Sequence, residues 1–286
     1  MADPPRRPTT GPQDGDDAGL RDGTGPPILR HKRYDQPSLF LPENLLREAR
    51  RQKGLAEARV PRVCALDPDG DIVHHLVSGN VARRNPFWAC YHTSLHDVEY
   101  DGVSFGILGA VVGAPFAVLV AEELFASGCE LLIHVTSAGQ IAREPDPPFF
   151  VLIEKALRDE GTSYHYLPPG RYSDIDARLL LILEGAFDGL TVQVRRGATW
   201  TTDAPFRETP AAIEAARSQG FLAVEMEAAG LYAFARARAR SVVCFAHVTN
   251  RMGTKIGDFE KGAEAGSRDA LRVIAETAKA WRRGKR

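Results

Sequence analysis

The sequence predicts an α/β fold, because short apolar strands alternate with amphipathic helices along most of its 286 residues. Glycine- and proline-containing turns close several predicted strands, and a hydrophobic content of 44% is enough for a sizeable core. Apolar strands that alternate with helices are typical of a buried central sheet with helices on both faces. We therefore predict one α/β domain, residues 36–286, after a leader of residues 1–35.

The leader is rich in Pro, Gly, Asp, Arg and Thr and has almost no large apolar side chains. Such a segment cannot bury enough surface to offset the entropy lost on ordering, so we expect it to be disordered. The folded part is predicted to start near residue 36. Pro42 opens the first helix, because its fixed backbone suits a first helical turn and Leu45, Leu46 and Ala49 follow as an apolar stripe.

Beyond this helix, each predicted element has a local signal, such as helical spacing of Leu231, Phe234 and Ala235 or a glycine at a boundary. The predicted strands are residues 60–66, 103–112, 130–135, 191–195, 198–202, 220–224 and 241–248. The predicted helices are residues 114–127, 151–158, 177–187, 210–218, 228–238 and 264–281. The strand of residues 130–135 is expected to close on a turn of residues 136–139.

Composition excludes several functional classes. The net charge is −1 and the folded part has no long block of one sign, so no basic surface for nucleic acid or an anionic membrane is predicted. No apolar run reaches the roughly 18 residues of a membrane span. The four scattered cysteines lack metal-type spacing and are predicted to be buried reduced thiols rather than a metal site. We expect a cytoplasmic protein without a bound metal.

The run Val224-Glu225-Met226-Glu227 places two carboxylates where a predicted strand turns into a helix. Acidic residues in a first helical turn are favoured by the helix dipole. Alternatively, a carboxylate at a strand end can accept a bidentate hydrogen bond from a vicinal diol such as ribose. The run alone leaves both interpretations open.

Further polar and glycine clusters follow other predicted strands, where open α/β sheets bind ligands. Each cluster alone is typical of a turn, but together they predict a site. The clusters are Gly113, residues 136–139, residues 201–203, residues 225–227 and residues 249–251. His247, on the last predicted strand, is expected to be a core histidine.

Five segments resemble the purine nucleoside/uridine phosphorylase family (nucleoside phosphorylase class I), and most closely its uridine-phosphorylase-like branch. The segments are residues 113–128, 131–141, 201–208, 224–229 and 248–251. The resemblance covers roughly residues 55–280. It implies a three-layer α/β sandwich around a central mixed, partly barrel-like β-sheet, and assembly as a dimer or a ring of dimers.

The resemblance also implies an activity. Such an enzyme cleaves the N-glycosidic bond of a nucleoside with phosphate and releases free base and ribose 1-phosphate in nucleoside metabolism and salvage. A uridine-like nucleoside is the expected substrate. Phosphate is a co-substrate, and no cofactor is expected.

Site roles follow from the same resemblance. Glu227 would hold the ribose hydroxyls, Met226 would pack under the sugar, and Glu225 would support both. Phe206 would stack on the base. The other expected substrate-binding residues are Gly113, His134, Thr136, Ser137 and Gly139.

Asn250 and Arg251 complete the expected catalytic residues with Glu227. Asn250 stands where purine-specific relatives carry an acidic proton donor, and its amide can hydrogen-bond a base edge. Arg251 could neutralise a uracil-like leaving anion, or could form a surface salt bridge.

The sequence departs from the family where phosphate is bound. The family's Gly-Asp-Pro-x-Arg turn is replaced by Leu66-Asp67-Pro68-Asp69-Gly70, and its two other arginines fall at His134 and near Tyr91-His92. A phosphate dianion needs charge-assisted donors. Arg83, Arg84 or Arg195 could supply the charge from elsewhere. The alternatives are a nucleoside hydrolase that uses water and a catalytically silent nucleoside- or nucleotide-binding protein.

The identity of the base is also left open, because the sequence departs from the family at the base-binding residues. The Gln-x-Arg pair with which the pyrimidine branch recognises uracil is replaced by Glu208-Thr209-Pro210-Ala211.

Overall fold

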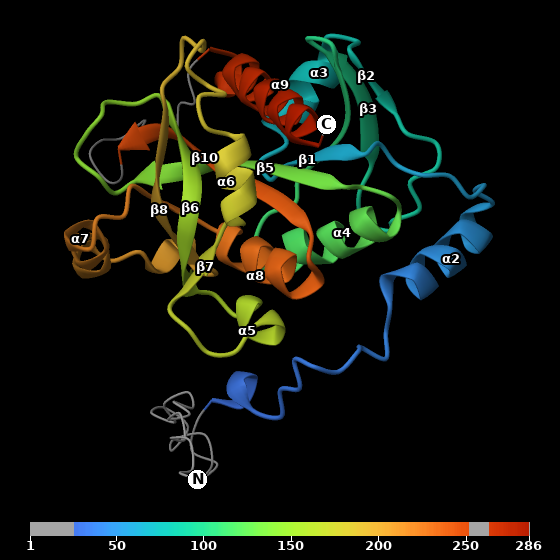
Figure 1. Ribbon diagram of the computed structural model, residues 1–286, viewed down its shortest axis with the longest axis horizontal. Helices are drawn as coiled ribbons and strands as arrows, with labels where there is room; N and C mark the ends of the chain where they lie inside the picture. The colour runs from blue at the N-terminus through green and yellow to red at the C-terminus, as the bar shows by residue number, and fades with distance from the viewer. Residues whose placement is uncertain (1–25, 252–262, 286) are drawn as a thin grey trace, which may run out of the picture. The chain divides into compact units, whose positions relative to one another are not determined.

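The computed structural model describes residues 26–251 and 263–285 (Figure 1). The chain divides into two units, residues 1–33 and 34–286. In the first unit the described residues include one short 3-10 helix, η1 (Pro27–Leu29). Most of the predicted leader, residues 1–25, lies outside the described residues, so its expected disorder stays a prediction.

The second unit is built on a ten-stranded mixed sheet in the order β10-β6-β8-β9-β5-β1-β4-β3-β2, with β7 paired to β6. The strands are β1 (Val63–Asp67), β2 (Ala82–Arg84), β3 (Leu95–Tyr100), β4 (Val103–Gly109), β5 (Leu131–Gln140), β6 (Phe149–Asp159), β7 (Tyr172–Asp174), β8 (Val194–Thr202), β9 (Ala223–Glu225) and β10 (Ser241–Arg251).

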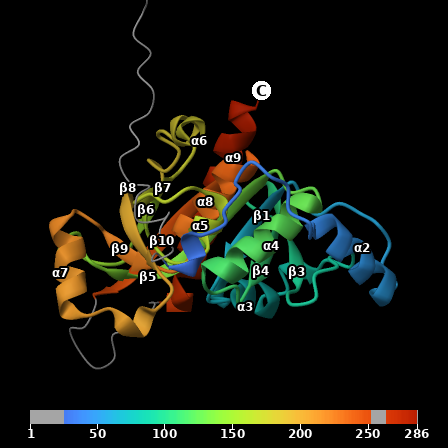
Figure 2. The ribbon, with the colours of Figure 1, turned by 90° about the horizontal axis from the view of Figure 1, so that it is seen from below.

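Part of this sheet closes on itself. Because β10 pairs with β5 as well as with β6, strands β5, β10, β6, β8 and β9 form a closed circuit. Strands β1, β4, β3 and β2 extend from the other edge of β5 as an open sheet. Figure 2 shows the closed strands on one side of the domain and β1, β4 and β3 on the other. The expected partly barrel-like mixed sheet is confirmed.

Helices cover both faces of the sheet. Figure 1 shows α3 and α9 on one side of β1 and β5, and α4 and α8 on the other. This arrangement confirms the three-layer sandwich. The helices are α2 (Pro42–Lys53), α3 (Asp71–Ser78), α4 (Ala114–Ala126), α5 (Ser163–Tyr166), α6 (Ala177–Ile182), α7 (Pro210–Ser218), α8 (Ala228–Arg238) and α9 (Ser267–Gly284), with the 3-10 helices η2 (Pro205–Arg207) and η3 (Ala263–Gly266). Within the described ranges, no helix combines the length and the apolar character needed to cross a membrane.

Three of the expected assignments are wrong. The predicted helix of residues 151–158 is strand β6, which pairs with β10 on one side and β8 on the other. Its apolar run is too short for periodicity to distinguish a buried helix from a buried strand. The two strands predicted at residues 191–195 and 198–202 are the single strand β8. The predicted turn of residues 136–139 is the continuation of β5, held by pairing to β10 and β9.

Candidate active site

The two carboxylates of the Glu-Met-Glu run lie at the start of α8 and are both buried. Glu225 ends β9, and its Oε1 accepts hydrogen bonds from the hydroxyls of Thr199 (3.1 Å) and Thr201. Its Oε2 accepts from the backbone N–H groups of Glu227 and Ala228, each at 2.7 Å. Burial, reinforced by the Glu227 carboxylate, raises the pKa of Glu225. Four donors satisfy this carboxylate, so Glu225 fixes the start of the helix.

Only one of the two carboxylate oxygens of Glu227 accepts a hydrogen bond from a described residue. Its side chain is 1% exposed, and Oε1 accepts a 2.7 Å hydrogen bond from the backbone N–H of Gly113. Its Oε2 lies 3.4 Å from Nε2 of His134, and no described residue forms a hydrogen bond with it. Gly113 has φ +89° at the start of α4, a conformation that L side chains rarely adopt. The glycine therefore aims its N–H at the carboxylate.

Close packing of α8 on α4 produces this contact. A Cβ at Gly230 would lie 2.8 Å from Cβ of Ala114, so a larger residue would force the helices apart. Gly230 thus lets the first turn of α8 reach the first turn of α4. This close approach brings Glu227 to Gly113.

His134 lies in the middle of β5, between Leu66 of β1 and Cys244 of β10. The side chain is fully buried, and neither ring nitrogen has a hydrogen-bond partner among the described residues. Buried polar atoms without a partner are costly and uncommon. The two ring nitrogens and Oε2 of Glu227 therefore mark a place where ligand hydroxyl groups would complete the hydrogen bonding.

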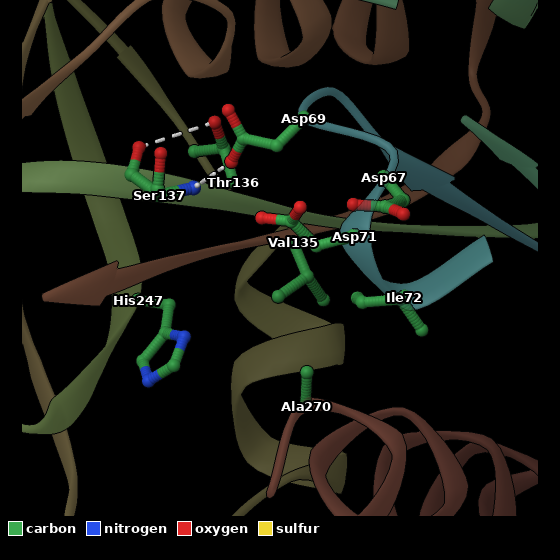
Figure 3. A pocket seen from close by; sticks show the side chains of 9 residues that line it. All are labelled: Asp67, Asp69, Asp71, Ile72, Val135, Thr136, Ser137, His247 and Ala270. Carbon is green, nitrogen blue, oxygen red and sulfur yellow. Dashed lines mark hydrogen bonds between the residues drawn. The ribbon is translucent and has the colours of Figure 1, made fainter. Parts of the chain in front are cut away.

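A second polar cluster lies where the turn after β1 approaches β5. A cavity of about 20 Å³ is lined there by Asp67, Asp69, Asp71, Ile72, Val135, Thr136, Ser137, His247 and Ala270 (Figure 3). This volume is enough for about one water molecule. Among the residues that the structure describes, the lining contains three carboxylates and neither arginine nor lysine.

The three carboxylates have different environments. Asp67 is buried and accepts a 2.9 Å hydrogen bond from the N–H of Val73. Burial and the charges of Asp69 and Asp71 raise the pKa of Asp67 to about 7. Asp69 is exposed, and its Oδ2 accepts a 3.1 Å hydrogen bond from the N–H of Ser137. Figure 3 shows the Asp69 side chain pointing across to Thr136 and Ser137.

The structure brings some expected site residues together and leaves others apart. Met226 is half-buried beside the two glutamates. Phe206 lies in η2 and is 100% exposed. Backbone pairing places Asn250 opposite Gly139 and Arg251 opposite Gln140. The side chains of Asn250 and Arg251 lie outside the described residues, so their roles stay predictions.

The expected clusters do not lie at one edge of the sheet. Strand β9 runs antiparallel to β5, while β8 runs parallel to β9. The carboxyl ends of β8 and β9 therefore point opposite to that of β5. Glu227 meets His134 in the middle of β5, because β9 pairs only with the end of that long strand.

The three arginines that could supply charge to phosphate lie on strands β2 and β8. Arg83 and Arg84 are on the edge strand β2, three strands from β1, which at about 4.8 Å a strand is roughly 14 Å. Arg195 donates to the carbonyl of Glu144 near the start of β8. Tyr91 donates its hydroxyl to Oε1 of Gln52 at 2.8 Å.

His247 packs as expected for a core histidine. Its ring stacks on Phe150 with centroids 4.1 Å apart, and a Cβ at Gly266 would lie 2.0 Å from the imidazole. All four cysteines are free and buried, as predicted.

The sequence did not predict the contacts of three polar side chains, although Thr201 lies in an expected cluster. Thr199 and Thr201 hold Glu225, and their alternate spacing on an otherwise buried strand was the available signal. Asp69 was noted as a charge, but its bond to Ser137 joins segments 68 residues apart and has no local signal.

A partly closed mixed sheet and two buried glutamates at the junction of β9 and α8 are the features of an enzyme of the nucleoside phosphorylase kind, as the resemblance predicts. The chain belongs to the phosphorylase superfamily, whose family model matches residues 70–279.

Curated relatives support this membership. A uridine phosphorylase of Thermococcus kodakarensis is 30% identical over 213 residues, which are 68% of this chain and 75% of the relative. A guanosine phosphorylase of Halorubrum lacusprofundi is 26% identical over 169 residues, 59% of this chain and 69% of the relative.

Solved structures confirm the fold. A uridine phosphorylase from Vibrio fischeri, complexed with 6-hydroxy-1-naphthoic acid, superposes with a TM-score of 0.66 at 20% identity, covering 80% of this chain and 97% of that one. A purine nucleoside phosphorylase from Toxoplasma gondii, in complex with immucillin-H, gives 0.67 at 17% identity, covering 80% and 94%.

Proposed function

We propose that this chain cleaves the N-glycosidic bond of a nucleoside with phosphate, with a uridine-like nucleoside as the first substrate. The observation that carries the proposal is the half-satisfied carboxylate of Glu227. One oxygen is fixed by Gly113, and the other faces His134 without a hydrogen bond from a described residue. A ribose diol can donate a hydrogen bond to this oxygen and can donate to or accept from the imidazole nitrogens.

The chemistry needs a fixed sugar. The glycosidic bond breaks toward an oxocarbenium-like ribose, so binding that orients the sugar against the nucleophile lowers the barrier. Glu227 is rigid because Glu225 fixes the start of α8 and Gly113 fixes Oε1. Met226 lies beside Glu227, where it would pack against one face of the sugar. The base would reach Phe206, Asn250 and Arg251, as the family resemblance implies.

A panel of nucleosides tests the proposal. The protein is incubated with each nucleoside, with and without phosphate, and free base, ribose and ribose 1-phosphate are measured. Phosphate-dependent release of base and ribose 1-phosphate is expected. Nucleoside binding without release of base from any member would contradict the proposal and would favour a silent binding protein.

Hydrolysis is the second candidate, and the acidic turn favours it. The cavity beside Thr136 and Ser137 has room for about one water and is lined by three carboxylates. Asp69 already accepts from the Ser137 N–H. In the same panel, a hydrolase would release ribose whether or not phosphate is added.

Assembly and location belong to the same proposal. Large apolar side chains on the described surface, including Leu39, Phe40 and Phe87, support a homo-oligomer, either a dimer or a ring of dimers. Four free, buried thiols support a reducing compartment, the cytoplasm. Light scattering of the purified protein measures the oligomeric state, and a monomer at working concentration would contradict the assembly.

A further inference from the structure

We propose that Glu123 is a pH-sensitive switch: as a neutral carboxylic acid it allows the loop of residues 85–94 to pack on α4, and its ionisation releases this loop. The inference goes beyond the proposed function, because it concerns a buried carboxyl group outside the candidate active site. It can therefore be tested without a substrate.

Glu123 lies on the side of α4 that faces the loop. The residue is 2% exposed, and neither carboxyl oxygen accepts a hydrogen bond of normal geometry from a described residue. The thiol of Cys90, in the loop, is close enough to interact with the carboxyl group. An ionised carboxylate without donors costs far more to bury than a neutral carboxylic acid. The packed loop therefore favours the neutral form of Glu123.

The surrounding charges do not remove this cost. The groups that act on Glu123 are Cys90 and His92 from the loop and Lys53 from α2. The Lys53 ammonium donates instead to the carbonyls of Ala89 and Cys90, at 2.9 Å and 2.5 Å. Burial raises the pKa of Glu123, and the three neighbouring groups oppose this rise only in part.

The loop is bound differently on its two sides. Hydrogen bonds from Lys53 and from the Tyr91 hydroxyl to Gln52 join it to α2. On the side of α4, the ring of His92 packs edge-on against Phe116, with centroids 6.4 Å apart. An ionised Glu123 needs water, and separation of the loop from α4 admits water without breaking the hydrogen bonds of the helix.

The contact between the loop and α4 lies next to the candidate active site. Phe116 is in the first turn of α4, three residues after Gly113, whose N–H binds Glu227. Release of the loop therefore removes the His92 contact from the same helix end that positions Glu227.

The direction of the pH effect follows from the two states of the loop. In the released state Glu123 has the ordinary carboxyl pKa of 4.5, and in the packed state its pKa is higher. Between these two values the packed state keeps a proton that the released state has lost. Release is therefore favoured by up to about tenfold for each pH unit in this interval and levels off above it.

Two matched variants separate Glu123 from other titrating groups. Glu123→Gln keeps the shape of the neutral acid and cannot ionise. Glu122→Gln removes the adjacent carboxylate of α4, which accepts hydrogen bonds from Tyr166 and Arg238, each at 3.1 Å. Thermal unfolding first verifies that both variants fold.

Alkylation of Cys90 by iodoacetamide, located by mass spectrometry, measures release, because this thiol is buried while the loop is packed. Dividing the wild-type rate by the Glu123→Gln rate at the same pH cancels the ionisation of the thiol itself. This ratio should rise about tenfold between about pH 5 and about pH 8. The ratio of wild type to Glu122→Gln should stay constant within about twofold. A ratio of wild type to Glu123→Gln that does not change with pH would overturn the inference.

Cys244 distinguishes release of the loop from unfolding of the whole domain. This thiol is fully buried on β10, in the core of the sheet, so its alkylation requires unfolding of the domain. In the wild type, Cys90 should react at least about tenfold faster than Cys244 at pH 8, and the difference should grow as the pH rises. Equal rates, or a difference that does not grow with pH, would overturn the inference. This comparison needs no variant, so it decides the question even if Glu123→Gln fails to fold.

Discussion

Nε2 of His134 lies 3.4 Å from Oε2 of Glu227, and both side chains are buried. The histidine comes from the middle of β5, and the glutamate from the first turn of α8. The family resemblance implies an arginine at the position of His134, so the carboxylate that we propose for sugar binding faces an imidazole rather than a permanent cation. The pair therefore links the proposed sugar contact to strand β5, which also carries Ser137.

Replacing Glu227 tests the ribose assignment. In Glu227→Ala, kcat/KM should fall by a factor that corresponds to about 2–4 kcal/mol of lost transition-state stabilisation. This is the scale of a lost pair of charged hydrogen bonds. Steady-state kinetics with the best nucleoside of the panel gives the value. Glu227→Gln is the matched control, since it keeps the shape and one acceptor and should lose less. A near-wild-type kcat/KM in Glu227→Ala would refute the assignment.

Glu225 should instead be a stability residue. Glu225→Ala leaves two hydroxyls and two helix N–H groups without their acceptor, so the free energy of unfolding should fall by about 3 kcal/mol or more. Urea unfolding measures the change. The same measurement on Glu227→Ala should show a smaller loss of unfolding free energy, because only the Gly113 N–H loses its acceptor. Equal losses would mean that Glu225 has no special part in fixing α8.

His134→Arg should strengthen the use of phosphate. It places a guanidinium, a permanent charge with several donors, where neither imidazole nitrogen has a partner among the described residues. The phosphate KM should fall relative to the wild type. Should the variant lose activity while the wild type already saturates at low phosphate, the alignment of His134 with the family arginine is wrong and the anion is held elsewhere.

Stability should depend on pH through Asp67. Its pKa rises from the ordinary 3.8 to about 7, so between these values the folded state keeps a proton that the unfolded state has lost. The free energy of unfolding should therefore fall as the pH rises from about 4 to about 7, and level off above that. Asp67→Asn should remove this slope. An identical pH profile in the variant would contradict the assignment to Asp67.

The leader should be dispensable for folding. Deletion of residues 1–33 should leave the thermal midpoint within about a degree or two, because this segment lacks a core-forming pattern. Extending the deletion to residue 35 also removes the 3.1 Å hydrogen bond from the Tyr34 hydroxyl to the Tyr164 carbonyl, with a loss of about 1 kcal/mol. A large drop after the shorter deletion would show that the leader stabilises the fold.

Local signals in the sequence predicted much of the scaffold. Pro42 and Pro210 begin helices as expected, and the Glu-Met-Glu run does lie between a strand and a helix. Long-range pairing was not predictable from such signals. The strand β6 and the extension of β5 both depend on hydrogen bonds to β10, roughly a hundred residues later in the chain. The contact from Asp69 to Ser137 likewise requires the three-dimensional fold.

Strand β5 belongs to both the closed circuit and the open sheet, and it carries His134 and Ser137 three residues apart. Three residues of extended strand span about 10 Å. Paired backbone thus fixes the separation between His134, next to the proposed sugar position, and Ser137, next to the proposed nucleophile position. The expected base contact, Phe206, lies instead on a short 3-10 turn at the surface. Base preference can therefore diverge through changes in that turn while the spacing of sugar and nucleophile is inherited unchanged.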